Sequence, residues 1–395
     1  MSYTALAWLG VALFIYSISV RQLQRAELTG PMWFVLIGIG LALGFEHHVS
    51  IRELDRQLWQ PVVELTLAIF LFSDAAKTRL RVLAASYQLP TLLLLLGLPL
   101  TVLFATAVAH YLLGLSFAAA ALLAIVVTPT DAALCRGFIT AKQVPANLRE
   151  AINIESGLND GLCVPLFLLA LALFDNPQAL AGGDIFMVFI RELGIALGVA
   201  VSLTLIAILL LKRAKFHHLF AKNTSPFLFV GFAIMVYALT QSLHGSGFIA
   251  AFVSGLLFDR FYNDELKDTL IAEGENIAEL AAMLSWTIFG FISLATLSQL
   301  SLAGFCYALG AVTILRVLPV LLALGRSNLD WQAKLTLAWF GPRGLASVVF
   351  TLMLLDMANP EVRLITEVAV CTILLSVFLH GLTTRPIALS FAKKF

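Results

Sequence analysis

Charged residues are scarce in this sequence, in which only 12% of the 395 residues are Asp, Glu, Lys or Arg. A typical soluble domain carries about 25%. The net charge of +1 leaves no basic excess with which to bind a polyanion. The composition therefore excludes a soluble enzyme, a disordered chain and a nucleic-acid-binding protein.

Cysteines are also few, and their spacing shows no pairing. Cys135, Cys163, Cys306 and Cys371 lie in or beside apolar runs, where they are expected to be small buried hydrophobic residues. This pattern supports neither a disulfide framework nor a metal site. We expect no cofactor and no enzymatic activity.

Apolar residues are abundant, at 60% of the chain, and the mean hydropathy is +0.94. A membrane-spanning helix needs about 20 apolar residues. We therefore predict an all-α polytopic membrane protein with no soluble regulatory domain, and a first span that is retained rather than cleaved as a signal peptide. Thirteen spans are expected, at residues 4–20, 31–44, 57–75, 89–110, 115–135, 153–174, 184–211, 225–242, 246–258, 276–296, 300–324, 333–355 and 364–388.

Positive charges support this count. Nineteen of the 25 lysines and arginines lie in or close to the loops after odd-numbered spans or the C-terminal tail, with Lys334 and Arg385 just inside the ends of spans, and three lie in the loops after even-numbered spans. Because cytoplasmic loops are enriched in Lys and Arg, the N-terminus is expected outside and the C-terminus in the cytoplasm.

The order of the spans predicts an inverted repeat. Residues 1–174 would form the first six-helix repeat, 184–211 a linking helix, and 225–388 the second repeat. Span five is interrupted by Thr128-Pro129-Thr130-Asp131 and span twelve by Gly341-Pro342-Arg343-Gly344. Proline breaks a helix, and paired breaks at corresponding positions of two halves are typical of a transporter binding site.

Polar residues gather in span six, within Glu155-Ser156-Gly157-Leu158-Asn159-Asp160. Glu155 and Asn159, like Ser156 and Asp160, are four residues apart and share a helix face. Their hard oxygen atoms suit an alkali cation better than a transition metal. Burial raises the pKa of a carboxyl, so Asp160 is predicted to hold either a proton or a cation.

Charged residues lie at or near both breaks. Asp131 is predicted either to bind a cation, with Thr130 as the nearest carbonyl ligand, or to face the positive end of a half-helix. Arg343 is predicted to offset the negative ends of half-helices. Arg316 in span eleven needs a buried anion, and Glu155 is its expected partner.

Other acidic residues are weaker candidates. Asp74 ends span three and is predicted to line the approach to the site or to lie at the membrane interface. Glu64, Glu279 and Glu367 are expected near an interface or in ion pairs.

The Thr-Pro-Thr-Asp, Glu-Ser-Gly-Leu-Asn-Asp and Gly-Pro-Arg-Gly segments resemble those of the NhaP-like monovalent cation:proton antiporters, the branch related to animal sodium/proton exchangers. The resemblance covers essentially the whole chain. It implies the sodium/proton antiporter fold, with a dimerisation domain and a core domain in which helices five and twelve are broken and cross. It also implies a homodimer and elevator-like movement of the core.

The resemblance further implies roles for residues at the matching positions. Na+ would be held by Asp160, Asp131, Ser156 and the Thr130 carbonyl, with Asn159 and Asp74 contributing to the cation and proton site. Glu155 and Arg316 would form a structural ion pair. The uncharged Asn159 stands where electrogenic relatives carry aspartate, which implies electroneutral exchange.

We therefore predict a Na+ (or Li+)/H+ antiporter of a prokaryotic inner membrane that serves sodium transport and pH homeostasis, with monovalent cations, protons and membrane lipid as its partners. A K+/H+ antiporter is the alternative within transport. A cation channel, a sensor on the same fold and an organic-anion symporter are further alternatives. A membrane-embedded hydrolase using Ser156 and His380 is the least favoured.

Overall fold

A computed structural model gives the structure of the chain. It describes residues 3–25, 28–45, 56–78, 88–175, 184–217, 225–262, 264, 267–355, 357 and 359–392. Helices make up nearly all of these residues, and the described part of the chain contains no β-strand beyond one isolated bridge. An all-helical fold was the sequence prediction, and it is confirmed.

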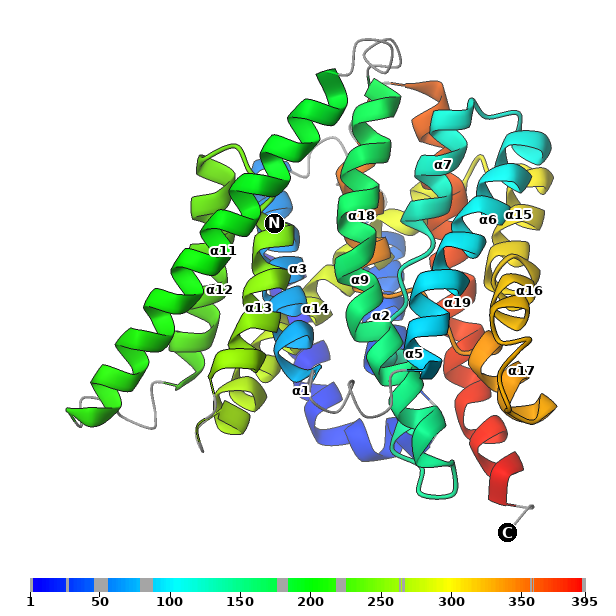
Figure 1. The fold of residues 1–395 in the computed structure, drawn as a ribbon. Coiled ribbons are helices and arrows are strands. Elements are labelled where there is room, and N and C mark those ends of the chain that lie inside the picture. Colours follow the sequence, from blue (N-terminus) through cyan, green and yellow to red (C-terminus); the bar gives the residue numbers. More distant parts are fainter. Residues whose placement is uncertain are drawn as a thin grey trace. The chain divides into compact units, whose positions relative to one another are not determined.

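The helices follow the predicted order along the chain (Figure 1). Their bounds are α1 (Tyr3–Arg25), α2 (Gly30–Phe45), α3 (Arg56–Lys77), α5 (Gln88–Leu92), the π-helical turn η2 (Leu93–Gly97), α6 (Leu98–Leu113), α7 (Phe117–Val126), the 3-10 turn η3 (Ala132–Cys135), α8 (Arg136–Ile139), α9 (Ala146–Asp175), α11 (Asp184–Phe216), α12 (Ser225–Ser242), α13 (Gly247–Phe261), α14 (Lys267–Leu297), α15 (Leu302–Val312), α16 (Ile314–Ala323), α17 (Trp331–Trp339), α18 (Leu345–Leu354) and α19 (Pro360–Ala392).

Six helical stretches within the described residues are long and apolar enough to cross a membrane. They are 88–113, 146–175, 187–216, 267–297, 302–323 and 360–392. Five shorter apolar helices accompany them. Each of the thirteen predicted segments contains a helix or a pair of helices, but the number of spans stays a prediction.

Side-chain caps explain where several helices begin. Ser116 accepts a hydrogen bond from the Ala119 N–H at the start of α7, and Ser301 does the same for Gly304 in α15. Asp330 caps α17 through the Ala333 N–H at 2.9 Å. Each cap satisfies a backbone donor that the first helical turn leaves without a partner.

The chain divides into two compact units. The first comprises Met1–Pro61, Gln88–Ser156 and Met283–Phe395, and the second comprises Val62–Tyr87 and Gly157–Ala282. Each unit combines segments from both predicted repeats. The inverted repeat therefore stays a prediction about internal symmetry rather than a description of these units.

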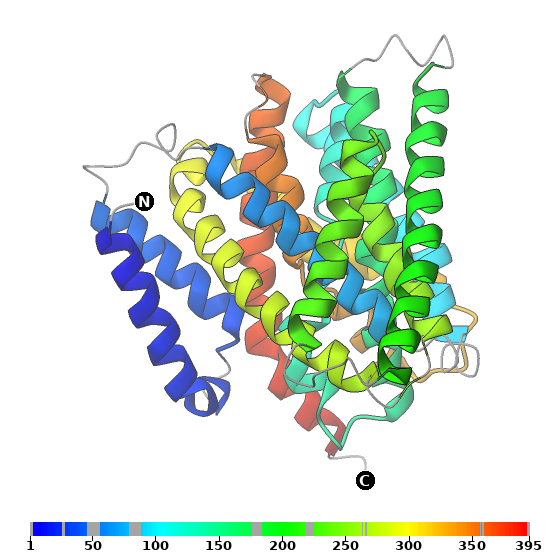
Figure 2. The same ribbon diagram turned by 90° about the vertical axis from the view of Figure 1, so that its left-hand side faces the viewer.

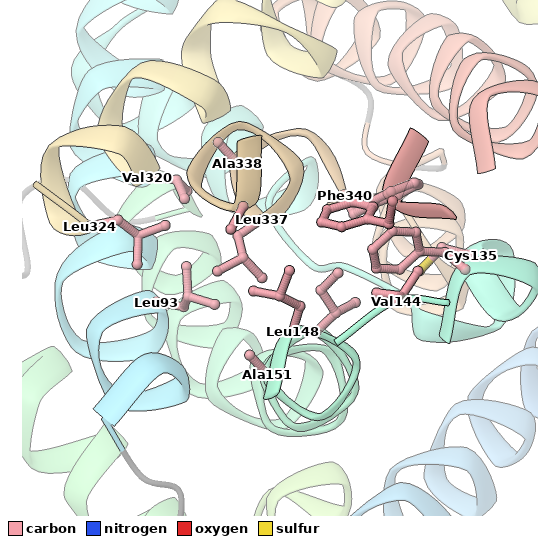
Figure 3. Packing of buried hydrophobic residues seen from close by; sticks show 14 of the residues in the cluster. Leu93, Cys135, Val144, Leu148, Ala151, Val320, Leu324, Leu337, Ala338 and Phe340 are labelled. Atoms are coloured by element: carbon pink, nitrogen blue, oxygen red, sulfur yellow. The ribbon is translucent and has the colours of Figure 1, made fainter. Parts of the chain in front are cut away.

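In the first unit, α6 packs against α7 and α16, while α19 packs against α15, α18 and α7. Helices α1 and α2 form an antiparallel pair (Figure 2). An apolar cluster joins α17 to the start of α9, with Leu148 and Leu337 pointing toward one another and Phe340 beside Cys135 (Figure 3). This cluster fixes both helices next to the broken segments.

In the second unit, α13 packs against α11 and α12. Phe72 of α3 contacts the rings of Phe229, Phe232 and Phe258, with centroid distances of 4.7, 5.5 and 6.0 Å. Gly255 of α13 approaches the backbone of α3 so closely that a Cβ there would overlap the Phe72 carbonyl oxygen. The aromatic cluster and the close glycine contact hold α3 against α13.

Candidate functional site

The first helix break follows α7. Helix α7 ends at Val126, the chain runs without helical structure through Asp131, and η3 begins at Ala132. Pro129 contributes to the break because its nitrogen carries no hydrogen. Asp131 caps the next turn, since its Oδ1 accepts a hydrogen bond of 2.8 Å from the Ala133 N–H. The carboxylate thus lies at the positive end of a half-helix, one of its two predicted positions.

The second break lies between α17 and α18, at residues 340–344. It meets the first break in an antiparallel bridge between Thr130 and Arg343. The Asp131 N–H also donates to the Pro342 carbonyl oxygen, at 2.8 Å. The two interrupted segments therefore satisfy each other's backbone groups, which a broken helix in an apolar environment requires.

Arg343 joins several helix ends at this crossing. Its side chain is buried, and its Nη1 donates to the Thr128 carbonyl oxygen at 2.9 Å. Its Nη2 donates to the carbonyl oxygen of Ala311, in the last turn of α15, at 2.6 Å. The guanidinium thus faces the negative ends of α7 and α15, as expected for charge compensation at helix C-termini.

Glu155 and Arg316 form a buried ion pair. Arg316 Nη2 lies 3.1 Å from Glu155 Oε2, and the two side chains are 4% and 3% exposed. Arg316 also donates to the Phe340 carbonyl oxygen at 3.2 Å. The pair is therefore tied to the start of the second break. A Cβ at residue 341 would overlap the guanidinium, so glycine is required there.

Two hydroxyl groups lie together beside the first break. Thr130 Oγ1 and Ser156 Oγ are 3.4 Å apart, and both residues are buried. The contact joins the crossing to α9. Within the described ranges, no group of three or more His, Cys, Asp and Glu side chains can hold a metal ion.

Helix α9 continues without interruption from Ser156 through Asn159 and Asp160. Asn159 and Asp160 are 0% and 1% exposed. Asn159 Oδ1 accepts a hydrogen bond from the Cys163 thiol at 3.0 Å. Because Asp160 follows Ser156 by four residues on one helix, the carboxylate and the hydroxyl lie on the same face.

Asp74 belongs to the second unit, near the end of α3. Its carboxylate lies 3.7 Å from Lys77 Nζ, and Lys77 in turn contacts Glu275 at 2.7 Å. A Cβ on Gly157 of α9 would stand 3.9 Å from the Asp74 carbonyl oxygen. Asp74 is therefore a neighbour of α9, with a side chain that is 23% exposed.

Two of the weaker acidic candidates have specific partners. Glu64 Oε2 accepts a hydrogen bond from the Tyr237 hydroxyl at 2.8 Å, and Glu367 pairs with Arg363 at 3.2 Å. Glu279 is half-buried. His380 contacts Ser376 and Trp339, while Ser156 contacts Thr130. The observed contacts therefore do not pair Ser156 with His380 in a hydrolase-like arrangement.

Sequence reasoning did not identify Ser376, whose Oγ accepts a hydrogen bond from the Arg343 N–H at 2.7 Å. Its spacing of four residues from His380 on a helix was the available signal. Thr128 was noted only for the break, yet its carbonyl is a partner of Arg343.

Two known antiporters are similar to this chain in sequence. The chain resembles the K(+)/H(+) antiporter NhaP of Alkalimonas amylolytica, with 24% identity over 386 residues, and covers 65% of that protein's length and 95% of its own. It resembles the Na(+)/H(+) antiporter NhaH of Halobacillus aidingensis with 26% identity over 398 residues, covering 95% of this chain and 96% of that one.

Among solved structures, the fold matches the sodium proton antiporter MjNhaP1 from Methanocaldococcus jannaschii. The TM-score is 0.77 at 21% identity, over 98% of this chain and 99% of the other. The family model described as sodium/hydrogen exchanger, transmembrane, matches residues 10–390. The chain belongs to the sodium/hydrogen exchanger family.

Proposed function

We propose that this protein is a secondary active antiporter that exchanges Na+ or Li+ for H+ across a membrane. The observation that carries the proposal is the crossing of two broken helices beside buried oxygen atoms, in a chain of this family. Such breaks expose backbone carbonyls in a protected site, where a cation can shed its water. Exchange by this route needs no cofactor and no covalent chemistry.

In this proposal Asp160 binds either the cation or the proton. Ser156, one helical turn away, supplies a hydroxyl, and the first break supplies Asp131 and the Thr130 carbonyl. Asn159 and Asp74 line the site. A site that must be loaded with one ion or the other before it moves couples the two fluxes, so that exchange is obligatory.

The remaining charged residues hold the site rather than bind the ion. Glu155 and Arg316 would form the structural ion pair, and their 3.1 Å contact supports that assignment. The bonds from Arg343 to two helix-terminal carbonyls support its role in dipole compensation. Asn159 in place of a second aspartate supports an electroneutral exchange of one cation for one proton.

We further propose thirteen spans arranged as two inverted six-helix repeats, at residues 1–174 and 225–388, around the linking helix 184–211. The N-terminus would lie outside and the C-terminus in the cytoplasm of a prokaryotic inner membrane. A homodimer is proposed, with the early spans at its interface. Exposed apolar side chains on α1, including Trp8 and Phe14, suit a partner copy or lipid.

K+/H+ exchange is the second candidate. The relative named as a K(+)/H(+) antiporter matches 386 residues at 24% identity, and the one named as a Na(+)/H(+) antiporter matches 398 at 26%. These similarities support both ions equally. Selectivity depends on the number and spacing of the oxygen ligands around the ion.

Proton flux in proteoliposomes with an imposed pH gradient tests the proposal. Na+, Li+, K+ and choline would be added in turn to wild type, Asp160→Asn and Asp264→Asn. The last is a matched control, because Asp264 forms an ion pair with Lys215 at 2.7 Å and is not among the residues assigned to the site. We expect Na+ or Li+ to dissipate the gradient in wild type and the control, choline to have no effect, and Asp160→Asn to be inactive.

Other outcomes distinguish the alternatives. Dissipation by K+ alone would assign K+/H+ exchange. Cation flux without a pH gradient would indicate a channel, and the absence of any flux would favour a sensor. Normal exchange by Asp160→Asn would contradict the assignment of Asp160.

A further inference from the structure

His380 of α19 lies in the interior of the first unit, with 0% of its surface exposed. Its Nε2 is 3.0 Å from the Trp339 carbonyl oxygen. A carbonyl oxygen can only accept a hydrogen bond, so Nε2 must carry the hydrogen. Trp339 is the last residue of α17, and its carbonyl oxygen also accepts a hydrogen bond from the Gly341 N–H at 2.9 Å.

The other ring nitrogen faces Ser376, one turn earlier on α19. His380 Nδ1 is 3.0 Å from Ser376 Oγ and 3.0 Å from the Ser376 carbonyl oxygen. Ser376 Oγ already accepts the Arg343 N–H at 2.7 Å. The hydroxyl hydrogen of Ser376 is therefore available to Nδ1, which accepts it in a neutral ring.

These contacts reach the second break at two points. His380 contacts the carbonyl oxygen of Trp339, where α17 ends. It also contacts Ser376, which accepts a hydrogen bond from the backbone N–H of Arg343 within the break. The same Arg343 forms the antiparallel bridge with Thr130. A displacement of His380 would therefore be transmitted to the backbone of the first break.

We propose that His380 and Ser376 form a neutral hydrogen-bonded strut that sets the spacing of the 340–344 break and thereby positions Thr130 and Asp131 for the cation. The inference rests on the proposed function for its transport consequence. His380 is a positioning residue in this scheme, since its ring nitrogens contact Trp339 and Ser376 rather than the cation ligands.

Burial favours the neutral form of the ring, since none of its surface is exposed and an isolated buried charge is costly. The carbonyl oxygens of Trp339 and Ser376 can only accept hydrogen bonds and act in the opposite sense, whereas the Ser376 hydroxyl can donate to Nδ1. Arg343 and Arg316 already act on the ring with positive charge. A third positive charge buried near them would be unfavourable. The strut therefore keeps a single hydrogen-bond pattern over the range in which histidine normally titrates.

Transport measurements with four variants test the positioning role. His380→Leu and Ser376→Ala each remove part of the strut, whereas His380→Gln keeps an amide N–H for the Trp339 carbonyl. Thr372→Val is the matched control, because it removes a buried hydroxyl of α19 whose hydrogen bond, at 2.8 Å, goes to the Val368 carbonyl oxygen of the same helix. The readout is the cation concentration that gives half-maximal exchange.

We expect His380→Leu and Ser376→Ala to raise that concentration about tenfold, which corresponds to the loss of one buried hydrogen bond. His380→Gln should stay within about twofold of wild type, and Thr372→Val should match wild type. If wild type exchanges cations and His380→Leu shows unchanged half-saturation, the positioning role is wrong. If wild type exchanges nothing, the proposed function fails instead.

Nitrogen NMR of histidine-labelled protein tests the strut without transport. The chain has seven histidines, and the signal lost in His380→Gln identifies His380. A neutral ring with hydrogen on Nε2, unchanged from about pH 5 to pH 8, is expected. Hydrogen on Nδ1, or titration within that range, would overturn the inference even if His380→Leu does not fold.

Discussion

The backbone N–H of Asp131 donates to the carbonyl oxygen of Pro342, 211 positions later in the chain, at 2.8 Å. Both groups are available because a proline interrupts each helix: Pro129 stands two residues before Asp131, and Pro342 itself supplies the acceptor. The contact converts two local interruptions into one crossing. A crossing made by backbone atoms fixes the separation of the two segments more firmly than side chains would.

Removal of one member of the Glu155–Arg316 pair should be more damaging than removal of both. Glu155→Gln or Arg316→Met leaves a buried charge without its partner, which costs about 3–5 kcal/mol of stability. Replacing both residues by Met should restore part of that loss. Thermal unfolding of the four proteins in detergent measures the difference. A double variant less stable than each single variant would contradict the expected coupling.

Gly341→Ala should destabilise the protein, because the added methyl group overlaps the Arg316 guanidinium. The guanidinium or the break must then shift, and overpacking of this kind costs about 1–3 kcal/mol. Gly40→Ala in α2 is a suitable control, since nothing lies within 4 Å of a Cβ built there. Equal melting temperatures for the two variants would argue against the close contact at residue 341.

Replacing Arg343 with lysine (Arg343→Lys) should destabilise the protein. The guanidinium reaches the carbonyl oxygens of Thr128 and Ala311 at the same time, whereas an ammonium group is a compact charge with different geometry. Loss of one such bond costs about 1.5–3 kcal/mol. Arg326→Lys, at an exposed position after α16, should melt as wild type does. A thermally unaffected Arg343→Lys would show that charge alone suffices.

Exchange should depend on pH with a bell shape. At low pH, protons occupy Asp160 and compete with the cation, so the cation concentration for half-maximal exchange rises as pH falls. At high pH, the site lacks the proton needed for the return step. Antiport rates across a pH series at fixed sodium measure both limbs. A rate that changes in one direction only would count against simple competition.

Asn159 should make the exchange insensitive to membrane potential. One cation leaving for one proton moves no net charge, so clamping the voltage with valinomycin and K+ should leave a Na+/H+ rate unchanged. Asn159→Asp adds an ionisable group beside Asp160 and is expected to introduce voltage dependence. A wild-type rate that follows the imposed voltage would contradict electroneutrality.

Several parts of this architecture follow from local rules and could be predicted. Proline marked both breaks, because it lacks the N–H that a helix needs, and glycine marked the second break as well, because its conformational freedom disfavours a helix. Arg316 needed a buried anion, and the structure contains a contact of 3.1 Å with Glu155. The helical segments emerged from hydropathy because apolar runs of membrane length have few alternatives to a helix.

Other parts depend on partners that the sequence does not specify. Residues 115–135 were expected to form a span interrupted at residues 128–131, but the sequence did not indicate that the chain after the break would form the short turns η3 and α8. Nothing in the sequence indicated that the carbonyl oxygen of Ala311 would accept a hydrogen bond from Arg343. A sequence shows that a buried polar group needs a partner, but the partner depends on how distant helices pack.

Ser156 and Asp160 lie on one uninterrupted helix, α9, which also carries Glu155. An inserted residue between them would rotate the carboxylate by about 100° around the helix axis while the ion pair stays in place. A substitution in this stretch alters one side chain, whereas a change in length turns every later side chain away from the face that it occupies. During evolution, length variation should therefore accumulate in the loops and be absent from residues 155–160, whatever ion a given lineage came to carry.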